Sequence, residues 1–144
     1  MRIQLLILPF LIGGCAVQNS GIQSSTMAKS INPPGGKAIV YIVRPSIFGG
    51  AVRGVVDCDN SYLGSVAGLK FLYTIQRPGK HTFTGFAQNK SSLDLVLEPG
   101  KTYYIQQKMS FGNFYSKNKM VLLSEAQGKK KLAACQLSKD CVEN

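Results

Sequence analysis

The hydrophobic and polar positions divide the chain into three parts. An apolar run extends from Ile3 to Ile12, interrupted by Gln4 and Pro9. Residues 16–36 are rich in Ser, Gly, Asn and Pro and have almost no apolar period, so they predict a flexible tether with little surface to bury. From Lys37 onward, short apolar runs alternate with turn residues, which is typical of a β-domain.

The β-domain begins with a run that has no polar face. Ala38 to Arg44 (AIVYIVR) is β-branched and aromatic, which predicts a central strand covered on both sides. The runs that follow alternate with a period of two, and this alternation points Cys58 inward. We therefore expect an all-β fold, a small antiparallel β-sandwich over residues 37–126. The remaining residues, 127–144, are expected to hold most of a short helix (125–134) and a tail.

Turn residues separate the expected strands. Asp59-Asn60 predicts a tight hairpin, because both residue types tolerate the left-handed conformation. Pro78-Gly79-Lys80 and Pro99-Gly100-Lys101 repeat one turn motif 21 residues apart, which predicts two short strands of an antiparallel meander between them. Because no helix is expected after either turn, these motifs are interpreted as scaffold turns rather than as phosphate-binding loops.

The apolar run at the N-terminus is too short to span a bilayer, which takes about 20 apolar residues, but it suits a secretory signal. It ends in Leu11-Ile12-Gly13-Gly14-Cys15, which resembles the lipobox of bacterial lipoproteins (aliphatic, small, small, Cys). The resemblance implies removal of residues 1–14 and a lipidated tether over residues 15–36, with the lipid on Cys15. Ala16 in place of Asp implies transport to the outer membrane, on the periplasmic side. The alternative is a buried N-terminal element with an incidental cysteine.

The charge balance is strongly basic. The chain has 17 Lys and Arg against 7 Asp and Glu, a net charge of +10, of which Arg2 would be lost with the signal. Nucleic acid is excluded as a partner because an exported, lipidated protein does not meet it. The available anions are lipid head groups and envelope polymers, and Lys129, Lys130 and Lys131 are the candidate contacts. The alternative is that these lysines only solvate the surface.

Three cysteines remain after Cys15. An oxidising compartment favours pairing, and Cys135 with Cys141 is the closest pair in sequence. Pairing of Cys58 with one of them is the rival, and a free, buried Cys58 is the further alternative. Zinc is not expected, because the chain has no CxxC pair and its single histidine, His81, is far from all three in sequence. We therefore expect no metal and no cofactor besides the lipid on Cys15.

Residues 111–118 (FGNFYSKN) combine polar residues, Gly and aromatics, which predicts an exposed loop or hairpin end. Phe111, Phe114 and Tyr115 are the best candidates for an exposed contact patch. The alternative is that these rings fold back onto the sandwich.

Four segments then carry a resemblance to a known family. They are Tyr41-Ile42-Val43-Arg44-Pro45-Ser46, Asp59-Asn60-Ser61-Tyr62-Leu63-Gly64, Pro78-Gly79-Lys80-His81 and Gly100-Lys101-Thr102-Tyr103-Tyr104-Ile105. Their order and spacing over about residues 37–126 resemble the bacterial lipoprotein family catalogued as domain of unknown function 2846, with turns similar to those of PEGA β-modules. The resemblance implies an exported β-sandwich domain and brings no activity with it.

An enzyme is not expected, because the chain has one histidine and none of the motifs HExxH, GxSxG or CxxC. Asp57 and Asp59 flank a hairpin turn and have a sufficient structural role there. The leading hypothesis is a membrane-anchored, non-catalytic module that meets another envelope protein through a sheet edge or its aromatic loop. The alternative is a basic domain that binds an anionic envelope polymer or lipid.

Overall fold

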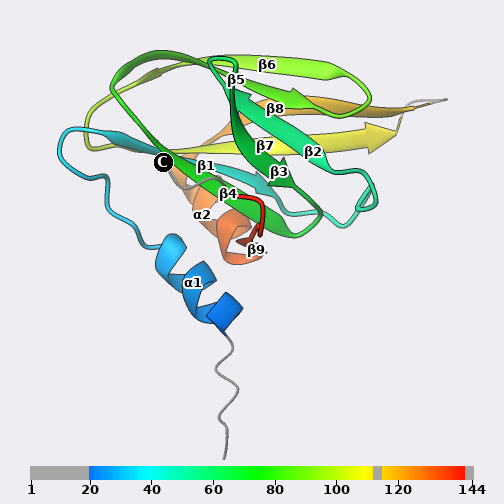
Figure 1. Ribbon diagram of the computed structural model, residues 1–144, viewed down its shortest axis with the longest axis horizontal. Coiled ribbons are helices and arrows are strands. Elements are labelled where there is room, and N and C mark those ends of the chain that lie inside the picture. The colour runs from blue at the N-terminus through cyan, green and yellow to red at the C-terminus, as the bar shows by residue number, and fades with distance from the viewer. Residues whose placement is uncertain (1–19, 112–114, 142–144) are drawn as a thin grey trace, which may run out of the picture.

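The computed structural model describes residues 20–111 and 115–141. Most of them lie in strands of two stacked sheets, with the helices on the outer side of one sheet (Figure 1). One sheet has the strand order β8-β7-β1-β4-β9 and the other β3-β2-β5-β6, so the predicted small β-sandwich is confirmed. The elements are α1 (Ser20–Ala28), β1 (Ala38–Arg44), β2 (Gly54–Cys58), β3 (Ser61–Val66), β4 (Lys70–Gln76), β5 (Gly79–Phe86), β6 (Lys90–Leu97), β7 (Thr102–Phe111), β8 (Ser116–Leu123), α2 (Glu125–Ala133) and β9 (Gln136–Leu137).

Strand β1 occupies the centre of the first sheet, and all of its residues are buried, as its apolar sequence predicts. It pairs antiparallel with β4 and parallel with β7, so this sheet is mixed. Its inward residues, such as Val40 and Ile42, pack between the two sheets with Phe83 and Ile105. Its outward residues Ile39, Tyr41 and Val43 pack under the helices, in a cluster that includes Ala28, Phe71 and Leu132.

Helix α1 corrects, over Ser20–Ala28, the prediction that residues 16–36 form a flexible tether. Ser25 and Ala28 are buried, and the Tyr41 hydroxyl donates a hydrogen bond to the Ala28 carbonyl at 2.7 Å. The Leu137 N–H donates to Ser25 Oγ at 2.9 Å, which joins the helix to β9. Three of the nine helix residues are Ser and one is Gly, so the stability of the helix comes from these tertiary contacts rather than from its own propensity. The domain therefore begins at or before Ser20.

Helix α2 confirms the short helix predicted near the C-terminus. Ser124 Oγ caps the helix by accepting from the Gln127 N–H, and the Ser124 N–H donates to Gln127 Oε1. Gly128 lies on the face that meets β7, where an added Cβ would be 2.1 Å from Tyr104 Cγ. This glycine therefore allows the helix to approach the sheet closely. No helix within residues 20–111 and 115–141 is long and apolar enough to cross a membrane.

The turns bear out one expectation and correct another. Asp59 and Asn60 form the β2–β3 hairpin with positive φ angles of 51° and 66°, as predicted. Pro78-Gly79 and Pro99-Gly100 are not turns of a single meander, because β4 and β7 belong to one sheet whereas β5 and β6 belong to the other. Each Pro-Gly motif thus carries the chain from one sheet to the next, and only the β5–β6 pair between them is a hairpin.

The contact between Gly128 and Tyr104 predicts the effect of a substitution in α2. Gly128→Ala should destabilise the domain, because overpacking costs about 1–3 kcal/mol whereas the gain in helix propensity is at most about 1 kcal/mol. Denaturant unfolding of the full chain measures this difference. Lys130→Ala, on the exposed side of the same helix, is the control and should stay within about 0.5 kcal/mol of the unsubstituted protein. A Gly128→Ala protein as stable as the unsubstituted one would contradict the packing described.

Candidate functional site

Two residues singled out in the sequence, Cys15 and Phe114, lie outside the described residues. The predicted lipidation of Cys15 therefore stays a prediction. Of the predicted aromatic patch, Phe111 and Tyr115 are described, and their place is given below.

The predicted Cys135–Cys141 disulfide is wrong, and so is the rival bond from Cys58. Cys58 and Cys135 both carry free thiols. The physical reason is the sheet that separates the two C-terminal cysteines. Cys135 is buried in the outer cluster beneath the helices, whereas Cys141 packs against the cluster between the sheets, with its Sγ 3.6 Å from the Tyr73 carbonyl oxygen. The further alternative, a free and buried Cys58, is confirmed.

The Lys129–Lys131 run does not form one exposed cationic group. Lys129 pairs with Glu125 one turn earlier in α2, with Nζ and Oε1 2.5 Å apart. Lys131 is half-buried and donates to Gln106 Oε1 at 2.5 Å. Two of the three lysines thus have partners within the domain, which weakens the run as a contact for an external polyanion.

One end of the sandwich carries an exposed apolar surface, which we call the aromatic end and define as Ile47, Phe48, Phe111 and Tyr115. Their exposed fractions are 73%, 55%, 59% and 49%. The Phe48 and Phe111 rings meet edge to face at 4.6 Å, although one follows β1 and the other ends β7. The sequence pattern indicates Phe111 and Tyr115 but not Ile47 and Phe48, whose loop has no strand periodicity.

A pocket of about 340 Å³ opens beside Phe48 and is lined also by Arg44, Gln107 and Met109. Arg44 is fully buried, and its guanidinium donates to the carbonyls of Val66 and of loop residues 48, 49 and 52. Arg44 Nε and both amide atoms of the buried Gln107 have no hydrogen-bond partner among the described residues. Gln107 fits between the sheets because Gly54 stands opposite it, where a Cβ would lie 2.2 Å from Gln107 Oε1.

The edge strand β8 is covered by side chains of the β5–β6 hairpin. The backbone N–H groups of Ser116, Asn118 and Met120 donate to the side chains of Gln88, Asn89 and Ser91 at 2.5, 2.5 and 3.0 Å. Asn89 Nδ2 also donates to the Asn118 carbonyl at 2.9 Å, so this amide takes the place of a neighbouring strand. The edge is therefore protected against strand addition.

The edge strand β3 is covered by the C-terminal tail. Ser138 Oγ donates to the Ser65 carbonyl at 2.7 Å, and Ser65 Oγ donates to Asp140 Oδ2 at 2.8 Å. A Cβ at Gly64 would lie 2.3 Å from the Asp140 carbonyl oxygen, so the tail lies directly on this strand. Of the two contact modes expected from the sequence, the sheet edge is therefore blocked at β8 and β3.

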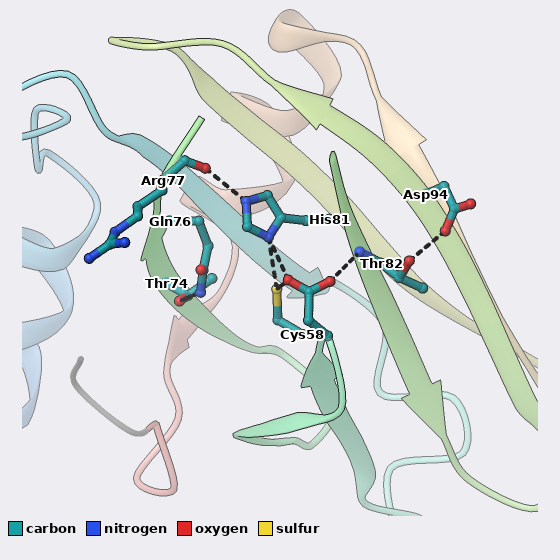
Figure 2. Close-up of polar contacts among 8 residues, drawn as sticks. Cys58, Thr74, Gln76, Arg77, His81, Thr82 and Asp94 are labelled. Atoms are coloured by element: carbon teal, nitrogen blue, oxygen red, sulfur yellow. Dashed lines mark hydrogen bonds and ion pairs between the residues drawn. The ribbon is translucent and has the colours of Figure 1, made fainter. Parts of the chain in front are cut away.

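A polar cluster that the sequence analysis missed lies at the opposite end of the strands from the aromatic end, where β2 ends and β5 begins. It consists of Cys58, Asp59 and His81, whose ligand atoms lie within 4.8 Å of one another. Figure 2 shows the His81 ring between the Arg77 carbonyl and the Cys58 thiol. His81 Nδ1 is 2.6 Å from Asp59 Oδ2 and 3.9 Å from Cys58 Sγ, and Nε2 is 2.8 Å from the Arg77 oxygen.

The geometry of this cluster differs from that of a nucleophilic triad. In a triad the two ring nitrogens serve the nucleophile and the carboxylate separately. Here both Cys58 and Asp59 face Nδ1, and Nε2 is used by a backbone carbonyl. Burial, and next the charge of Asp59, raise the pKa of the Cys58 thiol to about 12, which disfavours a reactive thiolate. The N–H of Thr82, followed by the His81 ring, lowers the pKa of the Asp59 carboxyl.

Comparison with known proteins finds similarity to an uncharacterised protein. No family model matches the chain. An uncharacterized protein of Haemophilus influenzae is 28% identical over 140 residues, which cover 95% of this chain and 83% of that protein. The similarity extends over nearly the whole chain and carries no function with it. The resemblance of residues 37–126 to domain of unknown function 2846 therefore stays a prediction.

Proposed function

We propose that this protein is a bacterial envelope lipoprotein, anchored through Cys15, and that it acts as a non-catalytic module that binds another envelope protein through its aromatic end. The observation that carries the binding role is the exposed Phe48–Phe111 pair beside a pocket lined by buried Arg44 and Gln107. The support for the anchor is the lipobox-like sequence Leu11–Cys15. The proposed location is the outer membrane, with the domain in the periplasm.

Helix α1 shortens the segment that would link the lipid on Cys15 to the folded domain. Only residues 16–19 separate Cys15 from α1 at Ser20. Five residue steps reach at most about 18 Å even when fully extended. A lipid on Cys15 would therefore keep the α1 side of the domain next to the membrane surface, rather than hold it away on a long spacer.

The aromatic end suits a protein partner better than a polymer or a lipid. Exposed aromatic side chains are enriched at the centres of protein interfaces. The pocket beside them is lined in part by the apolar side chains of Phe48 and Met109. Because β8 and β3 are covered, strand addition at these edges would first have to break the bonds that cover them. We therefore assign the contact to the aromatic end and the occupant to an apolar segment of an envelope protein.

The proposal of a non-catalytic role is supported by the Cys58–Asp59–His81 cluster, which does not have the arrangement of a triad. The electrostatic alternative, binding of an anionic polymer or lipid, has less support because Lys129 and Lys131 are engaged within the domain.

The anchor is tested by metabolic labelling of cells with a fatty acid. The unsubstituted chain should incorporate the label and lose residues 1–14, whereas Cys15→Ser should do neither. Cys141→Ser is the control, since it leaves the lipobox intact, and it should be labelled normally. If the Cys15→Ser protein is still labelled and still cut after Gly14, Cys15 is not the lipidation site.

The binding role is tested by in vivo cross-linking and recovery of the full chain. Phe111→Ser should reduce recovery of the partner protein at least about tenfold, because truncation of a central aromatic costs about 2 kcal/mol or more. Val96→Ser removes an apolar side chain that is 68% exposed on β6 and should have no effect. Two results would count against the proposal: an equal loss with Val96→Ser, and binding by the unsubstituted chain that disappears at high ionic strength, which would favour the electrostatic alternative.

A further inference from the structure

We propose that Cys58 Sγ, Asp59 Oδ2 and His81 Nδ1 form a binding site for one zinc ion. This site is separate from the proposed partner-binding surface, because β2 runs from the loop beside the aromatic end to Cys58 at the other end of the sheet. The Cys58 and His81 side chains come from the end of β2 and from β5 (Figure 2). The Asp59 side chain comes from the β2–β3 hairpin.

The three donor atoms converge on one point. In a tetrahedral zinc site the ligand atoms are about 3.4–3.6 Å apart, given Zn–S near 2.3 Å and Zn–N and Zn–O near 2.1 Å. The Sγ–Oδ2 and Sγ–Nδ1 distances are 3.7 and 3.9 Å, close to these values. The Nδ1–Oδ2 distance is 2.6 Å, that of a hydrogen bond, and needs to open by about 0.8 Å to admit the ion. The required movement is within the reach of the Asp59 side chain, which is 49% exposed.

Two hydrogen bonds already orient the ligands. The Thr82 N–H donates to Asp59 Oδ1 at 2.8 Å, which leaves Oδ2 facing the cluster. His81 Nε2 lies 2.8 Å from the Arg77 carbonyl, an acceptor that requires a proton on Nε2. A neutral ring protonated at Nε2 has its lone pair on Nδ1, the form that binds a metal. Such outer hydrogen bonds to a backbone carbonyl are usual for zinc-bound histidine.

The ligand set selects the class of metal. A thiolate with an imidazole favours zinc and similar transition ions, whereas calcium and magnesium take oxygen ligands. Three protein ligands leave a fourth position, which a water molecule can fill because Asp59 and His81 reach the surface. Binding releases the Cys58 thiol proton, and any proton held between His81 and Asp59, to solvent.

A plain His81–Asp59 ion pair is the competing explanation, and it accounts for the 2.6 Å contact alone. It gives Cys58 no role, although the Cys58 thiol is buried against the same ring nitrogen. An experiment that reports on the sulfur therefore separates the two explanations.

The experiment is a titration of the purified full chain, freed of metal by a chelator, with Co²⁺ and then with Zn²⁺. One equivalent of Co²⁺ should produce a thiolate-to-cobalt absorption band, and one equivalent of Zn²⁺ should remove it and raise the unfolding temperature. Cys58→Ser and His81→Gln should each abolish the band and lower the zinc affinity more than about 100-fold, since even the loss of an orienting partner costs 10–100-fold.

Two variants serve as controls. Cys135→Ser removes another buried thiol, and Asp94→Asn removes a carboxylate that accepts from Thr82 Oγ1 on the same strand as His81. Both should keep the band and the stoichiometry. If a ligand variant fails to fold, native mass spectrometry of the unsubstituted chain with Zn²⁺, together with the cobalt absorption band of that chain, decides the question. Absence of a stoichiometric ion, or zinc binding without any thiolate signal, would overturn the proposal.

Discussion

Burial of strand β1 on both faces is the constraint on which the rest of the structure depends. Each fully buried aliphatic or aromatic side chain contributes about 1.5–3 kcal/mol, so neither face of this strand can be left to water. The second sheet covers the face that carries Val40 and Ile42, and α1 and α2 cover the face that carries Ile39, Tyr41 and Val43. Helices α1 and α2, which precede and follow the strands of the sandwich in the chain, therefore contribute to its core.

The same arrangement determines which surfaces remain for other molecules. Side chains from Gln88 to Ser91 cover β8, and the tail over Ser138–Asp140 covers β3. The two ends of the strands are among the surfaces that stay accessible. One end carries the aromatic surface and its pocket, and the other carries the Cys58–Asp59–His81 cluster. The proposed partner-binding surface and the proposed zinc site therefore lie at opposite ends of the sandwich.

Sequence patterns predict the strands and turns of this fold better than they predict which of these elements contact one another. The run AIVYIVR predicts a doubly covered strand, and Asp59-Asn60 predicts a hairpin, because both signals are local. Helix α1 is not predictable in this way, since Tyr41 and Leu137 stabilise it from elsewhere in the chain. The cysteines show the same limit: Cys135 and Cys141 are close in sequence but lie on opposite faces of a sheet. The sequence alternation points Cys58 inward, but only the pairing of β2 with β5 brings His81 beside it.

The most direct test of the account maps the contact surface in living cells with a photo-cross-linking amino acid placed at one position at a time. Position 48 represents the aromatic end, position 119 the covered β8 edge, position 96 the β6 strand and position 130 the exposed side of α2. The account predicts a protein cross-link from position 48 and none from positions 119, 96 or 130. A cross-link from position 119 or 96 without one from position 48 would contradict it, because the partner would then bind a sheet edge rather than the aromatic end.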